Sequence, residues 1–145
     1  GRITPASMLP ILVFAWIYRP IPGIAAGTMD GIMQLVQGAY VIHPMQFLLD
    51  YILPFAVLGI AGLFRKDNQL PLGIVLGSAA RFIIHVLSGV IYFASSAPAG
   101  QSPLLYSLGY NATYLVPELI ICLAIVLVPR MKHALIRIKH EAKIA

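Results

Sequence analysis

Five ionisable side chains stand inside stretches that are otherwise almost wholly apolar. They are the carboxylates of Asp30, Asp50 and Glu118, the imidazole of His85 and the guanidinium of Arg81. An ionisable group in hydrocarbon costs ~2.5–3.5 kcal/mol on insertion scales, so membrane proteins place such groups against one another or against a water-filled space. These residue types therefore predict a polar pocket that faces away from lipid and can both accept and donate hydrogen bonds.

The composition indicates that the surrounding stretches span a membrane. Hydrophobic residues make up 59% of the 145 positions and charged residues only 10%, whereas a soluble domain carries about 25% charged residues. A span needs about 20 mostly apolar residues. We expect an all-α integral membrane protein, a helical bundle over residues 1–129 followed by a basic cytoplasmic tail over 130–145. The polar and Pro/Gly-rich breaks predict five spans, at residues 5–18, 21–37, 44–64, 70–93 and 104–128.

Lysine and arginine gather on alternate connections. They follow the first, third and fifth expected spans, whereas residues 38–43 and 94–103 contain none. Because cytoplasmic loops retain positive charge, we expect a cytoplasmic C-terminus and a bacterial inner membrane. The net charge of +5 then reflects topology and attraction to anionic lipid head groups. It does not indicate nucleic-acid binding, since no basic soluble surface interleaved with aromatic residues accompanies it.

Most polar groups share helix faces. Residues at i, i+4, i+7 and i+11 lie on one face of a helix, and four such faces carry Gly27, Asp30 and Gln34; Gln46, Asp50 and Pro54; Arg81, His85, Ser88 and Tyr92; and Ser107, Asn111, Tyr114 and Glu118. In the expected orientation, the polar groups at 50–51, 92 and 106–111 lie toward the outside. A cluster of aromatic rings and acids there suits a small aromatic cation or a polar heterocycle.

Each of these residues also has a plainer interpretation. Asp50 could serve only to neutralise Arg81, which could instead extend to the head groups, and His85 could be a hydrogen-bonded core residue. The tyrosines at 106–114 could form an aromatic belt at the membrane surface. The lone Cys122 is expected to pack in the core, because a disulfide or a thiolate metal site needs a second cysteine. We expect no catalytic group, metal or cofactor.

Three segments together resemble a known family. They read HPMQFLLDYILPFAVLGIAGLFRK, RFIIHVLSGVIYF and SAPAGQSPLLYSLGYNATYLVPE. Their LLDY, RFxxHxxSG and YSLxYN patterns resemble the thiamine-specific substrate-binding subunits of energy-coupling factor (ECF) transporters, from SMLPILVFA onward. The resemblance implies a six-helix fold of which five helices are visible, with the family's first helix missing. A removed signal peptide is the alternative explanation for the start of the chain.

The resemblance also implies roles for individual residues. Asp50 and Tyr51 would hold the aminopyrimidine ring of thiamine, and Asn111 would form a hydrogen bond to the same ring. His85 and Tyr106 would approach the thiazolium.

The chain departs from the family pattern at three places. Asp30 and Phe93 stand where some relatives place a stacking Trp, and the segment GRITPA lacks the Trp and Glu of those relatives' external loop. Phe93 can still stack, and Asp30 could offset the thiazolium charge.

The implied function is high-affinity capture and uptake of thiamine across the lipid bilayer. The implied partners are a transmembrane coupling protein and two ATP-binding ATPase subunits, because the chain has no G-x-x-x-x-G-K-[ST] loop with which to bind ATP itself. Three alternatives stay open: a subunit for another small heterocycle such as hydroxymethylpyrimidine or riboflavin, an intramembrane enzyme, and a structural membrane subunit without a ligand.

Overall fold

All regular elements in the described part of the chain are helices, as the sequence predicts. The computed structural model describes residues 6–38 and 41–144. Its α-helices are α1 (Leu9–Tyr18), α2 (Pro20–Val36), α3 (Pro44–Phe47), α4 (Leu53–Ala56), α5 (Leu70–Tyr92), α6 (Pro103–Leu127) and α7 (Pro129–Ile144). A π-helical turn, Leu48–Ile52, joins α3 to α4, and a 3₁₀ segment, Val57–Leu63, continues α4. Shorter 3₁₀ turns lie at Asp67–Gln69 and Ala94–Ser96.

The expected spans match these helices to within a few residues. In the described part of the chain, three helical stretches are long and apolar enough to cross a membrane: Pro44–Leu63, Asp67–Tyr92 and Pro103–Leu127. Helix α1 is apolar but has 10 residues, and α2 has 17, so both are shorter than a full span. The start of the first expected span, Pro5, lies outside the described residues.

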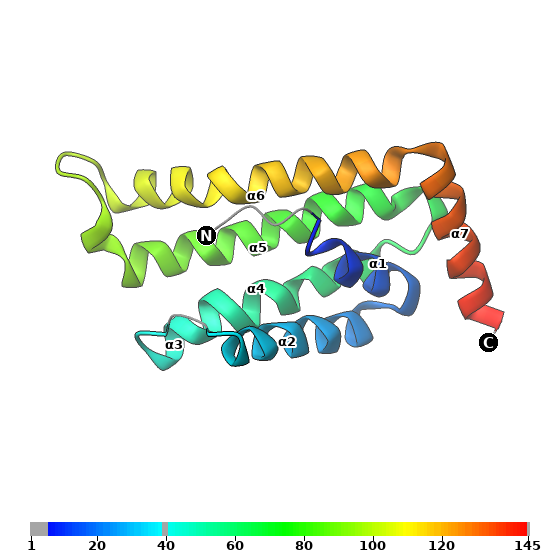
Figure 1. Ribbon diagram of the computed structural model, residues 1–145, viewed down its shortest axis with the longest axis horizontal. Helices are drawn as coiled ribbons and strands as arrows, with labels where there is room; N and C mark the ends of the chain where they lie inside the picture. Colours follow the sequence, from blue (N-terminus) through cyan, green and yellow to red (C-terminus); the bar gives the residue numbers. More distant parts are fainter. Residues whose placement is uncertain (1–5, 39–40, 145) are drawn as a thin grey trace.

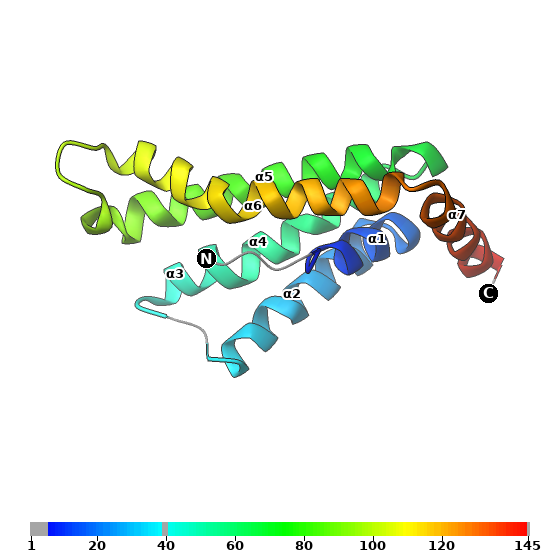
Figure 2. The ribbon, with the colours of Figure 1, turned by 45° about the horizontal axis from the view of Figure 1, so that its top comes forward.

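The long helices run side by side, and α7 crosses their end. Figure 1 and Figure 2 show α5 and α6 as an adjacent antiparallel pair, with the α3–α4 stretch beside α5 and α2 on the far side of that stretch. Helix α1 turns sharply into α2 at Arg19, whose φ is 86°. Helix α7 starts where α6 ends and runs across the bundle end that holds α1 (Figure 1).

Proline marks where the helices begin. Helices α1 to α6 each carry Pro in the first turn; where the helix starts a new stretch, the missing N–H would have no partner anyway. Pro54 has a further effect, because it cannot donate to the carbonyl of Asp50 four residues earlier. The backbone over Leu48–Ile52 forms a π-helical turn at this point. The sequence pattern does not predict this turn.

The buried apolar core lies in one half of the bundle. There α1 fills the space between the 3₁₀ segment, α5 and α6, and the apolar core includes Met8, Leu12, Trp16, Leu58, Ile74 and Cys122. Cys122 is fully buried, so its predicted core position is confirmed. The opposite half lacks a helix equivalent to α1 among the described residues.

The segment expected as a basic tail forms α7, and this helix is fixed to the bundle through Lys139. The Lys139 side chain is 1% exposed. Its ammonium donates to the Arg65 carbonyl, lies 3.4 Å from Asp67 Oδ1 and sits 4.4 Å from the centre of the Trp16 ring. His140 Nε2 lies 2.8 Å from the other Asp67 oxygen. Burial lowers the pKa of Lys139, and the hydrogen bond to Asp67 opposes that shift.

Two glycines allow α2 to approach the third helical stretch closely. A Cβ placed on Gly27 would overlap the backbone carbonyl of Phe55, and one on Gly31 would overlap that of Tyr51. Small residues allow membrane helices to gain van der Waals contact where no hydrophobic force drives them together. The stripe of small residues on α2 therefore sets the distance between α2 and the residues that follow Asp50.

We expect Gly27→Ala to lower the melting temperature, because overpacking of this kind costs about 1–3 kcal/mol. Gly109→Ala is the matched control, since a Cβ there meets nothing within 4 Å and Ala favours a helix over Gly by up to ~1 kcal/mol. Thermal unfolding of both purified variants, followed by circular dichroism in one detergent, compares them. An unchanged midpoint for Gly27→Ala would contradict the close packing of α2.

Candidate functional site

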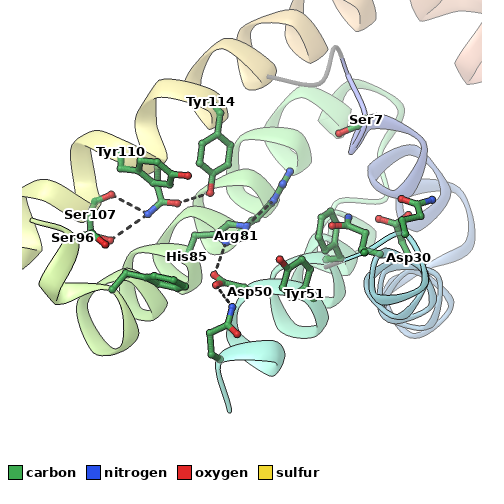
Figure 3. Close-up of a pocket in the computed structure, with 18 of the residues that line it drawn as sticks. Ser7, Asp30, Asp50, Tyr51, Arg81, His85, Ser96, Ser107, Tyr110 and Tyr114 are labelled. Carbon is green, nitrogen blue, oxygen red and sulfur yellow. Dashed lines mark hydrogen bonds and ion pairs between the residues drawn. The ribbon is translucent and has the colours of Figure 1, made fainter. Parts of the chain in front are cut away.

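A cavity of about 800 Å³ occupies the open half of the bundle. Its walls come from α2, the Pro44–Leu63 stretch, α5 and α6, and Figure 3 shows their side chains converging on it. All seven residues singled out from the sequence line this cavity: Asp30, Asp50, Tyr51, His85, Phe93, Tyr106 and Asn111. The volume falls within the range of about 300–1,000 Å³ that is usual for small-molecule sites.

A continuous chain of polar contacts runs along one wall. Gln46 Nε2 donates to Asp50 Oδ2 at 2.8 Å, and Asp50 Oδ1 lies 3.3 Å from His85 Nδ1. Arg81 Nε donates to His85 Nε2 at 3.3 Å, while Arg81 Nη1 lies 3.5 Å from Glu118 Oε2. Because His85 Nε2 accepts a hydrogen bond, the ring proton stands on Nδ1 and points to Asp50. These contacts with Asp50 and Arg81 therefore fix both the tautomer and the orientation of the His85 ring.

This arrangement corrects two plainer interpretations of the sequence. Arg81 does not extend to the head groups, since it is 6% exposed and lies between His85 and Glu118. Its ionic partner is Glu118, and His85 stands between Arg81 and Asp50. The contact of Asp50 with a positive charge is therefore indirect, and its carboxylate lies at the cavity surface.

Glu118 also holds the start of α1. Its Oε1 accepts hydrogen bonds from Ser7 Oγ at 2.6 Å and from the Met8 backbone N–H at 3.0 Å. Glu118 itself is fully buried and is not part of the cavity wall. The pair of Arg81 and Glu118 therefore closes the cavity floor and ties α5, α6 and α1 together there.

A second polar cluster lies on α6. Asn111 Nδ2 donates to the Ser107 carbonyl at 2.9 Å and lies 3.3 Å from Ser107 Oγ, while Asn111 Oδ1 accepts from the Tyr114 hydroxyl. Ser107 Oγ donates to the Val86 carbonyl of α5 at 2.9 Å. Local bonds therefore hold the amide of Asn111 in place at the cavity wall.

Aromatic rings form the opposite part of the wall. Tyr106, Tyr110 and Tyr114 follow one another at four-residue intervals, with ring centres 6.2 and 5.9 Å apart. All three line the cavity, so membrane-surface anchoring alone does not account for them. Tyr51 stacks on Phe47 with ring centres 5.7 Å apart. In Figure 3, Tyr51 and Asp30 lie on one side of Asp50 and His85, and Tyr110 and Tyr114 lie on the other.

The charges around the cavity favour a cation. Asp30 and Asp50 both line it, and the charge of Arg81 is balanced by Glu118. Asp30 forms no ion pair with any residue that the structure describes. Within residues 6–38 and 41–144, no group of three or more His, Cys, Asp or Glu side chains converges as metal ligands would.

Four wall residues were not anticipated: Ser7, Phe55, Gly89 and Ser96. Phe55 lies 4.6 Å below the Arg81 guanidinium, measured to its ring centre. No polar pattern marked Phe55 in the sequence, because it stands in an apolar run. Tyr92 is placed differently from the expectation, since it lies outside the cavity wall and stacks on His43, with ring centres 5.4 Å apart.

Comparison with proteins of known structure supports the fold. The chain matches a solved structure of ThiT from Listeria monocytogenes with a TM-score of 0.78, over 91% of this chain and 84% of that one. Sequence identity to it is 21%.

Comparison with curated proteins identifies closer relatives. The thiamine transporter ThiT of Bacillus subtilis (strain 168) is 39% identical over 142 aligned residues, which cover 88% of this chain and 73% of that protein. The thiamine transporter ThiT of Lacticaseibacillus paracasei (strain ATCC 334) is 29% identical over 123 residues, or 72% of this chain and 61% of the relative. A family model described as thiamine transporter protein matches residues 1–138. With that match over nearly the whole chain, an all-helical membrane fold and a polar cavity within it, the chain belongs to the thiamine transporter protein family.

Proposed function

We propose that this protein captures thiamine at the outer face of a bacterial membrane for uptake. The observation that carries the proposal is that Asp50, His85 and the α6 tyrosines line one cavity. The family match and the names of both curated relatives support a role in transport and not in catalysis.

Thiamine carries two chemically different rings, and the cavity offers groups for both. Its aminopyrimidine presents an amine donor and ring nitrogen acceptors, which suit the Asp50 carboxylate, the Tyr51 hydroxyl and the Asn111 amide. The Asp50 oxygens are pre-positioned for the amine by Gln46 and His85, at 2.8 and 3.3 Å.

The thiazolium ring is a permanent cation and needs a different environment. Tyr106 and Phe93 offer ring faces to it, since aromatic faces attract cations, and His85 lies at the same wall. Asp30, also in the cavity wall, supplies a negative charge that forms no ion pair with any residue that the structure describes. In this proposal the Asp50 carboxylate contacts the pyrimidine, and the rings of Tyr106 and Phe93 contact the thiazolium.

The cavity belongs to the end of the bundle that we assign to the outside. Its wall includes Gly38 and Ser96, which lie in the two connections without Lys or Arg. The connection between α1 and α2, the connection between α4 and α5 and helix α7 lie at the other end of the bundle (Figure 1). These connections contain Arg19, Arg65 and Lys66, and Lys139 of α7 contacts the Arg65 carbonyl. The positive-inside rule then places α7 in the cytoplasm and opens the cavity to the outside.

Uptake needs a source of energy outside this chain. We infer coupling of the ECF type, in which a transmembrane coupling protein and two ATPase subunits drive transport, from the resemblance of the sequence to ECF substrate-binding subunits. The sequence itself contains no Gly-rich phosphate-binding loop of the Walker type. In proteoliposomes, thiamine uptake by this protein should then require added coupling subunits and internal ATP. Uptake at full rate by the protein alone would exclude this arrangement.

We expect thiamine to raise the melting temperature of the detergent-purified protein. A ligand at 100 times its dissociation constant adds ~2.7 kcal/mol of stability, and calorimetry of the same sample gives the affinity. Hydroxymethylpyrimidine and riboflavin are the comparison ligands, because a site for both rings of thiamine should bind a pyrimidine alone more weakly. Stronger binding of either one would reassign the substrate, and no response to any of the three would favour a structural subunit.

We expect Asp50→Asn to weaken thiamine binding by about 2–5 kcal/mol, the usual result of truncating a buried charged partner. Two carboxylate controls separate the site from the fold. Glu118→Gln should lower the melting temperature of the ligand-free protein far more than it lowers affinity, because Glu118 lies behind the cavity floor. Asp67→Asn, in the loop before α5, should leave affinity unchanged. Equal affinity losses for Asp50→Asn and Glu118→Gln, measured by calorimetry, would show that the site is not centred on Asp50.

A further inference from the structure

Helix α7 is unlike the membrane helices that precede it. It follows the end of the α6 span at Leu127 after one non-helical residue, Val128, whose ψ of 125° breaks the helix. Its sequence, PRMKHALIRIKHEAKI, contains five Lys or Arg residues and one acid, Glu141. A helix this charged cannot span a bilayer, and its position places it directly at the membrane surface.

The contacts of α7 fix which way it faces. Lys139 is held by the Arg65 carbonyl and Asp67, and Leu135 and Ile136 pack against the apolar core. Figure 1 shows α7 running across the bundle end, at a steep angle to α5 and α6. The helix therefore lies along the surface in a defined rotation.

An apolar stripe remains uncovered beside this docked face. Met131 and Ile138 are 40% and 50% exposed, and they are seven residues apart, so they share one side of the helix. Leu127 and Val128, just before α7, are 59% and 49% exposed and continue the apolar surface toward the α6 span. This stripe is continuous with a surface that faces lipid.

Positive charge flanks the stripe. Arg130 and Arg137 each precede one of the two apolar residues and are also seven residues apart, so they share the neighbouring side of the helix. Lys132 and Lys143 are exposed on α7 as well. Long basic side chains beside an apolar stripe can place their charges among head groups while their stems cover hydrocarbon.

We propose that α7 is a surface-lying helix that binds anionic phospholipids of the inner leaflet, with Met131 and Ile138 inserted and Arg130 and Arg137 on the phosphates. The argument rests on charge complementarity, since juxtamembrane Lys/Arg clusters attract anionic lipid, and on continuity with the α6 span. The choice of leaflet rests on the topology given under the proposed function. A coupling subunit covering the same stripe is the competing occupant.

The test is a lipid-selective quenching measurement on the full chain. A bimane fluorophore is attached to Met131→Cys in a Cys122→Ala background, because Cys122 is the lone native cysteine. The labelled protein is placed in bilayer nanodiscs that contain either brominated phosphatidylglycerol or brominated phosphatidylcholine at the same mole fraction. We expect quenching by the brominated phosphatidylglycerol to be at least twofold stronger.

Two charge-matched double variants test the residues. Arg130→Gln with Arg137→Gln should abolish the preference for phosphatidylglycerol, whereas Arg19→Gln with Lys66→Gln, which removes the same charge from exposed positions outside α7, should keep it. Equal quenching by both lipids, or a preference that survives in the α7 variant, would overturn anionic lipid recognition. Absence of quenching by either lipid would overturn membrane contact and favour a protein occupant.

A separate measurement tests the topology on which the choice of leaflet rests. His133→Cys, at an exposed α7 position outside the apolar stripe, is made in the Cys122→Ala background; in intact cells it should resist a membrane-impermeant maleimide and react with it once the cells are permeabilised. Labelling in intact cells would place α7 outside and overturn the inner-leaflet assignment, whatever the nanodisc result. Thiamine binding does not enter either readout, so the substrate proposal and the lipid proposal can fail independently.

Discussion

The buried ion pair between Arg81 and Glu118 is the constraint on which the rest of the bundle depends. A guanidinium inside an apolar bundle is tolerated only with a partner, and removing one member of such a pair usually costs 3–5 kcal/mol. Here the pair does more than neutralise charge: Arg81 also orients His85, and Glu118 also holds Ser7 and Met8 at the start of α1. One interaction therefore closes the cavity floor and sets the proton position of His85 above it.

The two halves of the bundle have different interiors: one holds the apolar core, and the other holds the cavity. In one half, α1 fills the space between its neighbours and excludes water with side chains such as Trp16, Leu58 and Ile74. In the other half, α2 approaches the third helical stretch through Gly27 and Gly31, and the volume beside them stays open. The buried apolar cluster therefore lies in the half that does not line the cavity, while polar and aromatic side chains dominate the cavity wall.

Helical periodicity was enough to predict most polar members of the cavity wall, because each polar face belongs to a single helix. It did not predict the wall positions of Ser7, Phe55 and Ser96, and it wrongly included Tyr92. Asp50, His85 and Asn111 could be found in this way, since polar residues in apolar spans must face inward. The partners of these residues could not be predicted. Whether Arg81 meets Asp50 or Glu118 depends on the rotation and depth of three different helices. The π-helical turn before Pro54 and the docking of α7 through Lys139 likewise depend on contacts between segments far apart in the sequence.

The fluorescence of Trp16 can report on the contact between α7 and the bundle. It is the one Trp in the chain; its indole N–H donates to the Lys66 carbonyl at 3.1 Å, and the Lys139 ammonium lies over its ring. It does not line the large cavity. Indole emission responds to a nearby charge and to the polarity around the ring, so the intrinsic fluorescence of this protein reports on the attachment of α7 while remaining remote from events in the cavity.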